Sequence, residues 1–211
     1  MKERSAVPLQ RSSHQRGITL PEMMIAISIS SLIMIGAAQT YPLLRQQVAF
    51  LSQSGRLDQV MRQVMFRIEK DLRRAGFCNG SNGSCKENAI TIASKSGEPA
   101  GSCVIVAYDF NQNGKWEVPS HPTESEYFGY RLRRGALEGM RGVANCQESG
   151  WGKLLDPQEI VVTRFLVVRQ PGAARTGAAK KSVFRLQLAG HWAKHPKIHR
   201  QISLVFVGYN R

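Results

Sequence analysis

The segment RGITLPEMMIAISISSLIMIGAA, residues 16–38, decides the fold of this chain. From Ile18 to Ala38 it contains a single ionisable side chain, that of Glu22. A helix over these residues rises about 30 Å, which matches the hydrocarbon thickness of a bilayer. The sequence therefore predicts one membrane-spanning helix over residues 18–38.

Glu22 stands at the start of this apolar helix, where an unpaired carboxylate in lipid costs at least ~2.5 kcal/mol. One explanation is local. Thr19, Pro21 and Glu22 fit a capping box, in which the glutamate accepts a hydrogen bond from the first residue and proline suits the first turn. The other explanation is a salt partner outside this helix, and the preceding residues bear on it.

A short basic leader precedes the apolar segment. Its cations are Lys2, Arg4, Arg11 and Arg16. Gly17, an apolar residue and a glutamate fifth after the glycine follow. This arrangement resembles the class III signal of type IV prepilins and type II secretion pseudopilins. In that family a prepilin peptidase cuts after the glycine and methylates the new amino terminus, so the resemblance implies removal of leader 1–17 and N-methylation of Ile18.

The same resemblance implies an assembly role for Glu22, which would pair with the amino-terminal charge of a neighbouring subunit and set its register. Ile18 departs from the family, which more often has Phe or Met there. An ordinary secretory signal, cleaved after Ala38, is disfavoured, because such signals have only about 7–15 apolar residues and no glutamate at their head.

Length and charge bound the rest of the molecule. About 170 of the 211 residues lie beyond the span, which is enough for one compact domain. The leader carries four basic residues and one glutamate, so +11 of the net +14 belongs to the remaining chain. By the positive-inside rule, the amino terminus is expected in the cytoplasm and the head in the periplasm, with the helix in the inner membrane.

The four cysteines, Cys78, Cys85, Cys103 and Cys146, all follow the span, where an oxidising compartment would pair them. No two have the C-x2-C spacing of a zinc site. Three pairings are possible. The sequence favours Cys78 with Cys85, because turn-forming residues separate them, and Cys103 with Cys146 is then left.

The helical pattern continues through residues 39–76. Apolar side chains recur at steps of three and four: Leu57, Val60, Met61, Val64, Met65, Ile68 and Leu72. This spacing predicts an amphipathic helix whose apolar face packs on a sheet. Basic residues at 73–74 and Gly76 predict its end.

Residues 77–211 form the predicted head. Short β-rich runs occur at 90–92, 103–108, 127–132, 161–168, 183–188 and 202–207. Arg134 and Gly135 are typical of a hairpin turn. Because no helical pattern separates the strands, the prediction is a mainly antiparallel sheet with the long helix on one face, an α+β fold.

Three segments of the head narrow the resemblance: RRAGFC (73–78), YDFNQNGKWE (108–117) and YRLRRGALE (130–138), with Trp151 before 154–156. They resemble the larger minor pilins of the W/J type, and most closely the prepilin peptidase-dependent B family. The resemblance implies a protein that joins other minor pilins in a complex priming type IV pilus assembly. The further partners that it implies are prepilin peptidase, the major pilin and the inner membrane assembly platform. It also implies a place at the fibre tip. A type II secretion minor pseudopilin is the alternative.

A membrane-anchored module whose basic head binds DNA or another anionic ligand is a further alternative. The nearest basic groups are Arg131, Arg133, Arg134 and the pair at 180–181, but no aromatics interleave with them, so solvated strand edges and a loop are the favoured interpretation.

His191, His195 and His199 would share a helical face as a possible metal site, but Pro196 forbids that helix. No catalytic constellation is recognisable, and the sequence predicts that this protein is not an enzyme.

The segment 109–117 carries the pattern of a calcium loop. Asp109, Asn111 and Asn113 occupy positions one, three and five, Gly114 occupies position six, and Lys115 would offer its carbonyl. The glutamate of position twelve is missing. A site would have to borrow Glu117, Glu124 or Glu126. The competing interpretation is a polar turn around Asn113 and Gly114.

Overall fold

The computed structural model describes residues 17–80, 85, 88–117, 123–170 and 183–208. They form a long helix, α1 (Leu20–Arg74), followed by strands. The chain divides into two compact units, residues 1–49 and 50–211, which are taken in turn. The leader lies almost wholly outside the described residues, since the description starts at Gly17.

The first unit contains α1 up to residue 49. The helix starts as a capping arrangement, because the Thr19 amide and hydroxyl both donate to the Glu22 carboxylate at 3.1 Å. The amide of Met23 donates to the Thr19 carbonyl at 3.2 Å. Side chains of the described residues in this unit are exposed. By length and composition α1 includes a segment able to cross a membrane.

The second unit begins within α1 and contains the head. The helix ends at Arg74, and Gly76 follows with φ of 85°, the left-handed conformation that glycine adopts without steric cost. The Gly76 amide donates to the Ala107 carbonyl at 2.9 Å, which fixes the helix end to a strand. The predicted helix end is confirmed.

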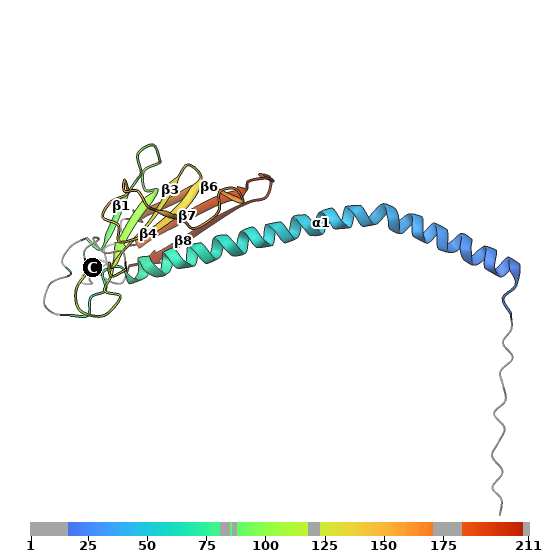
Figure 1. Ribbon diagram of the computed structural model, residues 1–211, viewed down its shortest axis with the longest axis horizontal. Coiled ribbons are helices and arrows are strands. Elements are labelled where there is room, and N and C mark those ends of the chain that lie inside the picture. The colour runs from blue at the N-terminus through green and yellow to red at the C-terminus, as the bar shows by residue number, and fades with distance from the viewer. Residues whose placement is uncertain (1–16, 81–84, 86–87, 118–122, 171–182, 209–211) are drawn as a thin grey trace, which may run out of the picture. The chain divides into compact units, whose positions relative to one another are not determined.

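Two antiparallel sheets make up the head (Figure 1). The first has the order β1-β2-β3-β4-β5 and the second the order β6-β7-β8. Their bounds are β1 Ile90–Ala93, β2 Cys103–Ala107, β3 Tyr127–Arg133, β4 Ala136–Arg141, β5 Gly152–Lys153, β6 Ile160–Gln170, β7 Val183–Trp192 and β8 His199–Val207. All six predicted strands are present. The sequence did not reveal β4, β5 or the division into two sheets.

Two glycines let the edge of the second sheet approach the first. The Val162 amide donates to the Gly135 carbonyl at 2.8 Å, and the Val167 amide donates to the Gly101 carbonyl at 2.9 Å. A Cβ on Gly101 would lie 2.9 Å from the Val167 carbonyl oxygen, and its φ is +80°. Gly135 (φ 78°) also completes the predicted hairpin turn with Arg134 (φ 48°) between β3 and β4.

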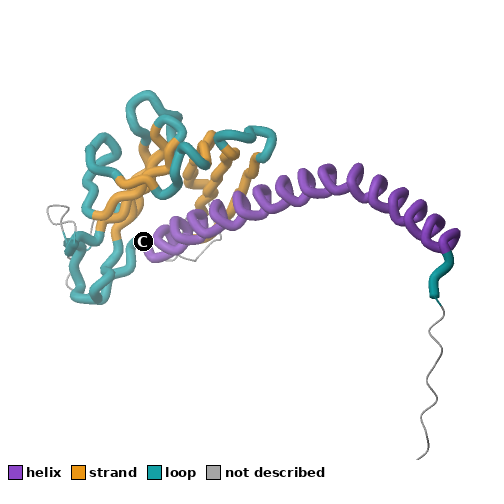
Figure 2. Tube along the Cα trace, turned by 45° about the vertical axis from the view of Figure 1, so that its right-hand side comes forward, coloured by secondary structure: helices purple, strands orange, loops and turns teal. Residues whose placement is uncertain are grey.

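The apolar face of α1 closes the core of the head. Figure 2 shows this end of the helix running beside the strands. The buried helix residues are Leu57, Met61, Met65, Ile68 and Leu72, and Val60 and Val64 are partly buried. They pack with inward-facing residues of both sheets, among them Val104 and Val106 of β2 and Phe165 and Val167 of β6. The helix-on-sheet prediction is confirmed.

The burial of Arg131 shows that the predicted location of this residue, on a solvated strand edge, is wrong. It is only 1% exposed and donates to the Glu138 carboxylate at 2.8 Å. It also donates to the carbonyls of Cys146 and Glu148, and its guanidinium lies 4.2 Å from the centre of the Trp151 ring. Sequence position alone did not show that these distant partners bury it.

Candidate functional site

The cleavage motif lies at the start of the described chain. Gly17, Ile18 and Thr19 precede the helix and are exposed, Ile18 being 72% exposed. A Cβ on Gly17 would meet no atom within 4 Å. Within the described chain, these three residues are therefore free of tertiary packing. Glu22, one turn further, is held by Thr19 within the same chain.

A band of exposed side chains lies on α1 opposite the core. Phe66 is 66% exposed, although its neighbours Met65 and Ile68 are fully buried. Arg62, one turn before Phe66, is also exposed, and its guanidinium pairs with Asp58 at 2.7 Å. A large aromatic ring on a water-facing helix surface is an exposed apolar group that could contact another molecule.

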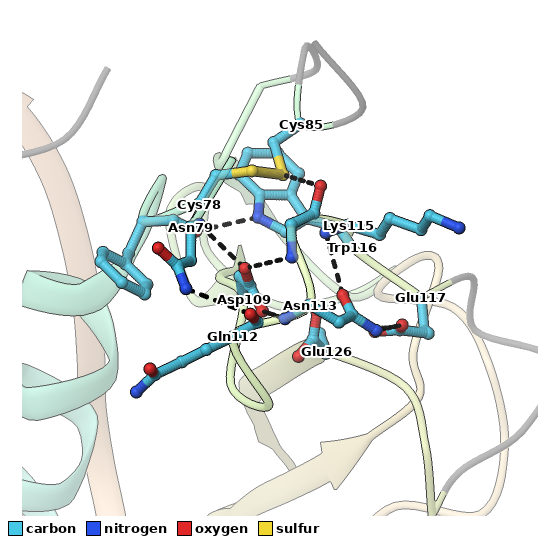
Figure 3. Close-up of a disulfide and its surroundings, with 12 residues drawn as sticks. Cys78, Asn79, Cys85, Asp109, Gln112, Asn113, Lys115, Trp116, Glu117 and Glu126 are labelled. Atoms are coloured by element: carbon cyan, nitrogen blue, oxygen red, sulfur yellow. Dashed lines mark hydrogen bonds between the residues drawn. A yellow bond between two sulfur atoms is a disulfide. The ribbon is translucent and has the colours of Figure 1, made fainter. Parts of the chain in front are cut away.

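The second candidate site is the connection between β2 and β3, which packs against the end of α1 (Figure 3). The Asn79 amide donates to Asp109 at 2.9 Å, and the Trp116 indole donates to the Phe77 carbonyl at 3.0 Å. A disulfide joins Cys78 to Cys85 beside this loop. The other disulfide joins Cys103 to Cys146, so the pairing is the one that the sequence favoured.

Asp109 organises the turn. It is 2% exposed, and its Oδ1 accepts a hydrogen bond from the Asn113 amide at 3.0 Å. Its Oδ2 accepts from the amides of Gly114 at 2.8 Å and of Asn79 at 2.9 Å. Three amide donors account for most of the accepting capacity of this carboxylate. Its first task is thus to hold the loop closed against the disulfide segment.

Asn111 and Asn113 shape the rest of the loop. The Asn111 side-chain oxygen accepts from the Asn113 amide at 3.0 Å, and that of Asn113 accepts from the Lys115 amide at 3.0 Å. The Asn113 side-chain amide donates to Glu117. The Lys115 side chain is exposed. Each amide oxygen retains one lone pair for a further partner.

Glu126, at the entrance to β3, lies against this loop and is 0% exposed. Its Oε1 accepts from the amides of Phe110 and Asn111. Its Oε2 and the Oε2 of Glu117 are both buried without a hydrogen-bond partner among the residues that the structure describes. Two acidic groups thus each leave one oxygen unpaired in the same place. Glu124, the other candidate from the sequence, is exposed.

The two carboxyl groups influence each other. Burial raises the pKa of Glu126, and the neighbouring Glu117 carboxylate raises it further. Burial would also raise the pKa of Glu117, but hydrogen bonds from Asn113 and from the Glu126 carboxyl outweigh it and lower that pKa. The pair therefore holds its negative charge mainly on Glu117. Glu126 stands outside a 12-residue calcium loop, so only the fold places it here.

The three histidines lie apart from this loop. His191 of β7 and His199 of β8 are paired across the second sheet, and His195 lies in the connection between those strands. Within the described part of the chain, no three His, Cys, Asp or Glu side chains converge as a metal group.

A separate hollow of about 540 Å³ lies between α1 and the second sheet. Arg56 on α1 pairs with Glu159 at 2.6 Å on its wall, and the Trp192 indole donates to the Gln53 carbonyl at 2.8 Å. These contacts join helix to sheet. Ser52, Lys194 and His195 are the described lining residues that could act as a nucleophile or a base, beside the carboxylates of Asp156 and Glu159.

A long amino-terminal helix with an apolar first half, followed by an α+β head, defines a pilin-like protein. The comparisons with known proteins agree. Residues 12–38 match the prokaryotic N-terminal methylation motif, and residues 50–207 match the model of prepilin peptidase-dependent protein B. This chain therefore belongs to the prepilin peptidase-dependent protein B family.

The chain is also similar in sequence to two individual proteins. It is 35% identical to prepilin peptidase-dependent protein B of Escherichia coli (strain K12), over 74% of this chain and 79% of the relative. It is 26% identical to an uncharacterized protein of Haemophilus influenzae, over 74% of this chain and 80% of the relative. No solved structure matches the chain.

Proposed function

We propose that this protein is a minor pilin that primes type IV pilus assembly within a complex of minor pilins and occupies the fibre tip. The observation that carries the proposal is the methylation motif at 12–38, with Gly17 and Glu22 on either side of the start of α1. Prepilin peptidase would cut between Gly17 and Ile18 and methylate Ile18. The major pilin and the inner membrane assembly platform are the further partners.

The proposed organisation has four parts. Residues 1–17 are the leader, 18–38 the span, 39–76 the amphipathic continuation of the helix, and 77–211 the periplasmic head. Anchoring by the apolar helix follows from its length and composition. The periplasmic location of the head is supported by the two disulfides, which persist in oxidising compartments.

Glu22 is proposed to guide assembly. Its carboxylate already accepts two hydrogen bonds from Thr19, which keeps it at the helix start. Removing the leader would place the new amino terminus of a neighbouring subunit at the same membrane depth. The attraction between that cation and Glu22 is strong in a low-dielectric surrounding, so it would set the axial register of the subunits.

The exposed band on α1 is proposed as a contact with neighbouring subunits. The Phe66 side chain is exposed and does not join the core of the head, and packing it against another helix would remove it from water. Nucleic acid is not the favoured partner, because the basic residue Arg131 is buried in the head.

Processing provides the first test. Co-expressed with active prepilin peptidase, the mature chain is expected to begin with methylated Ile18, whereas with inactive peptidase it keeps Met1. Gly17→Val is expected to block the cut. Gly36→Val is the matched control, since a Cβ there also meets nothing within 4 Å. Intact-mass and amino-terminal peptide analysis reads the outcome, and cleavage elsewhere contradicts the proposal.

Partner capture provides the second test. The processed chain is expected to co-purify from membranes with the minor pilins of a pilus system, and Glu22→Ala is expected to weaken this while leaving insertion intact. Parallel co-expression with the minor pseudopilins of a type II secretion system is the comparison. Preferential capture of the pseudopilins would move the protein to the secretion class.

A further inference from the structure

We propose that the β2–β3 connection binds a calcium ion through the carboxylates of Glu117 and Glu126 and the side-chain oxygens of Asn111 and Asn113. The site goes beyond the assembly role and stands independently of it. It lies next to the Cys78–Cys85 disulfide, at the end of α1 (Figure 3).

A simple polar turn accounts for only part of this loop. It explains Asp109, whose oxygens take three amide hydrogen bonds, and it explains the asparagine-capped turns that follow. It does not explain Glu126. A turn needs no fully buried carboxylate at the far end of the connection, and a buried acidic oxygen without a donor is costly.

The unpaired oxygens point to a cation. Glu126 Oε2 and Glu117 Oε2 are both buried, and apart from each other's carboxyl group they have no hydrogen-bond partner among the described residues. Both carboxyl groups contact one short segment, because Glu126 accepts from the Asn111 amide at 3.0 Å and Asn113 donates to Glu117. Two buried carboxyl groups in one place cannot both carry a full negative charge unless a positive charge compensates it. A divalent ion supplies that charge and takes both oxygens as ligands.

The chemical type of the proposed ligand atoms favours calcium over other metal ions. All four proposed side chains offer oxygen, two as carboxylates and two as neutral amides, which suits calcium. Zinc prefers nitrogen and sulfur ligands, and the two cysteines nearby are joined in a disulfide. Magnesium requires near-ideal octahedral geometry and tends to keep its waters. With only two carboxylates, the affinity is expected in the range of about 10⁻⁴ to 10⁻³ M that is typical of extracellular modules.

The site would connect three parts of the head. Glu126 enters β3, Asn111 and Asn113 belong to the loop, and Asp109 holds the same loop to Asn79 after the helix. An ion bound here therefore couples the start of β3 to the end of α1. Its loss is expected to loosen the loop before it affects the apolar core.

The test uses the purified full-length chain in detergent micelles, stripped with a chelator and melted with added CaCl₂. At 10 mM CaCl₂ the unfolding midpoint is expected to rise by about 4 °C, from mass action at the affinity above. Terbium, which replaces calcium at oxygen sites, is expected to luminesce when Trp116 is excited, and CaCl₂ is expected to quench this signal by competition.

Variants identify the ligands. Glu126→Gln and Glu117→Gln are each expected to abolish both responses, whereas the exposed neighbour Glu124→Gln keeps them. Without calcium, Glu126→Gln is expected to keep or raise the midpoint, because the amide retains the acceptor for Asn111 and adds a donor for Glu117. A merely structural Glu126 would instead lose stability without calcium.

Three results would overturn the site. The first is an unchanged midpoint in the wild-type chain. The second is an equal shift in the wild type and in both Gln variants, which would mean ions bound elsewhere. The third is an equal shift with 10 mM MgCl₂, which would remove the assignment to calcium. If Glu126→Gln fails to fold, the comparison of Glu117→Gln with Glu124→Gln decides.

Discussion

Replacing Arg131 by methionine is expected to be among the most damaging changes in the head. Arg131 of β3 lies directly opposite Glu138 of β4, and the two are 1% and 6% exposed. Methionine keeps much of the apolar stem of arginine but removes its charge and all its donors. The Glu138 carboxylate is then buried without its cation, and the carbonyls of Cys146 and Glu148 lose a donor.

The magnitude follows from the buried partners. Breaking a buried ion pair by removing one member costs about 3–5 kcal/mol, because the other charge remains desolvated. The lost contact with the Trp151 ring, 4.2 Å from the guanidinium, adds to this cost. For a chain of this size each kcal/mol lowers the unfolding midpoint by about 2–4 °C, so a loss of about 10 °C is expected.

A double-mutant cycle measures the coupling. Arg131→Met, Glu138→Leu and the combined variant are melted by near-ultraviolet circular dichroism, with Arg133→Met at the exposed end of the same strand as control. The combined variant is expected to recover at least ~1.5 kcal/mol relative to the sum of the single changes, since no lone charge remains. Additive losses, or a loss below ~1 kcal/mol for Arg131→Met, would refute the reasoning.

Two further changes test the head and its helix. Burial raises the pKa of Tyr108 to about 12 and also raises the pKa of Tyr130, and Asp71 accepts hydrogen bonds from both hydroxyls. Since the folded pKa values exceed the unfolded value, this stabilisation is complete below about pH 10 and is lost as pH rises toward 12, so the unfolding midpoint should fall there and fall less steeply in Tyr130→Phe. Phe66→Ser is expected to leave the midpoint within about 1 °C, because the ring is exposed, but to lower co-purification with other minor pilins; an unaltered yield would show that this ring makes no subunit contact.

The sequence predicted those helices and strands whose residues follow a clear hydrophobic periodicity. The stripe on α1 and the β-branched runs of β2 and β6 carry repeating signals, and both the helix and these strands are where they were expected. Strand β4 carries no such signal. Gly139 interrupts it because the Leu154 side chain lies only 3.1 Å from where a Cβ would be. Gly129 of β3 likewise makes room for Trp151, 2.6 Å from its Cβ position.

The charged residues of the head were harder to predict. A lone arginine or glutamate in a strand is usually exposed, so sequence reasoning assigned Arg131 to a solvated edge. Its burial depends on Glu138 across a hairpin and on carbonyls after β4, which no local pattern connects. Glu126 was one of three possible glutamates for the loop, and only the fold distinguishes it from the exposed Glu124.

The processing signal depends on residues that are close in the sequence, whereas the head depends on contacts between residues that are far apart in it. Gly17 and Glu22 are recognised within a few residues, so their pattern is legible in the sequence alone. The proposed assembly role would require the head to remain fastened to α1 while neighbouring subunits hold the helix. Asp71 on the helix accepts hydrogen bonds from Tyr108, just after β2, and from Tyr130 of β3, which fixes the helix side of this junction.

The loop after β2 fastens the other side of the junction. Gly76 bonds the Ala107 carbonyl, Trp116 bonds the Phe77 carbonyl, and Asp109 receives the Asn79 amide. A force along the helix would reach the sheets through these hydrogen bonds and through the apolar contacts of α1 with both sheets. An ion bound by Glu117 and Glu126 would reinforce the same loop. Calcium would therefore change the stability of the junction between α1 and the head.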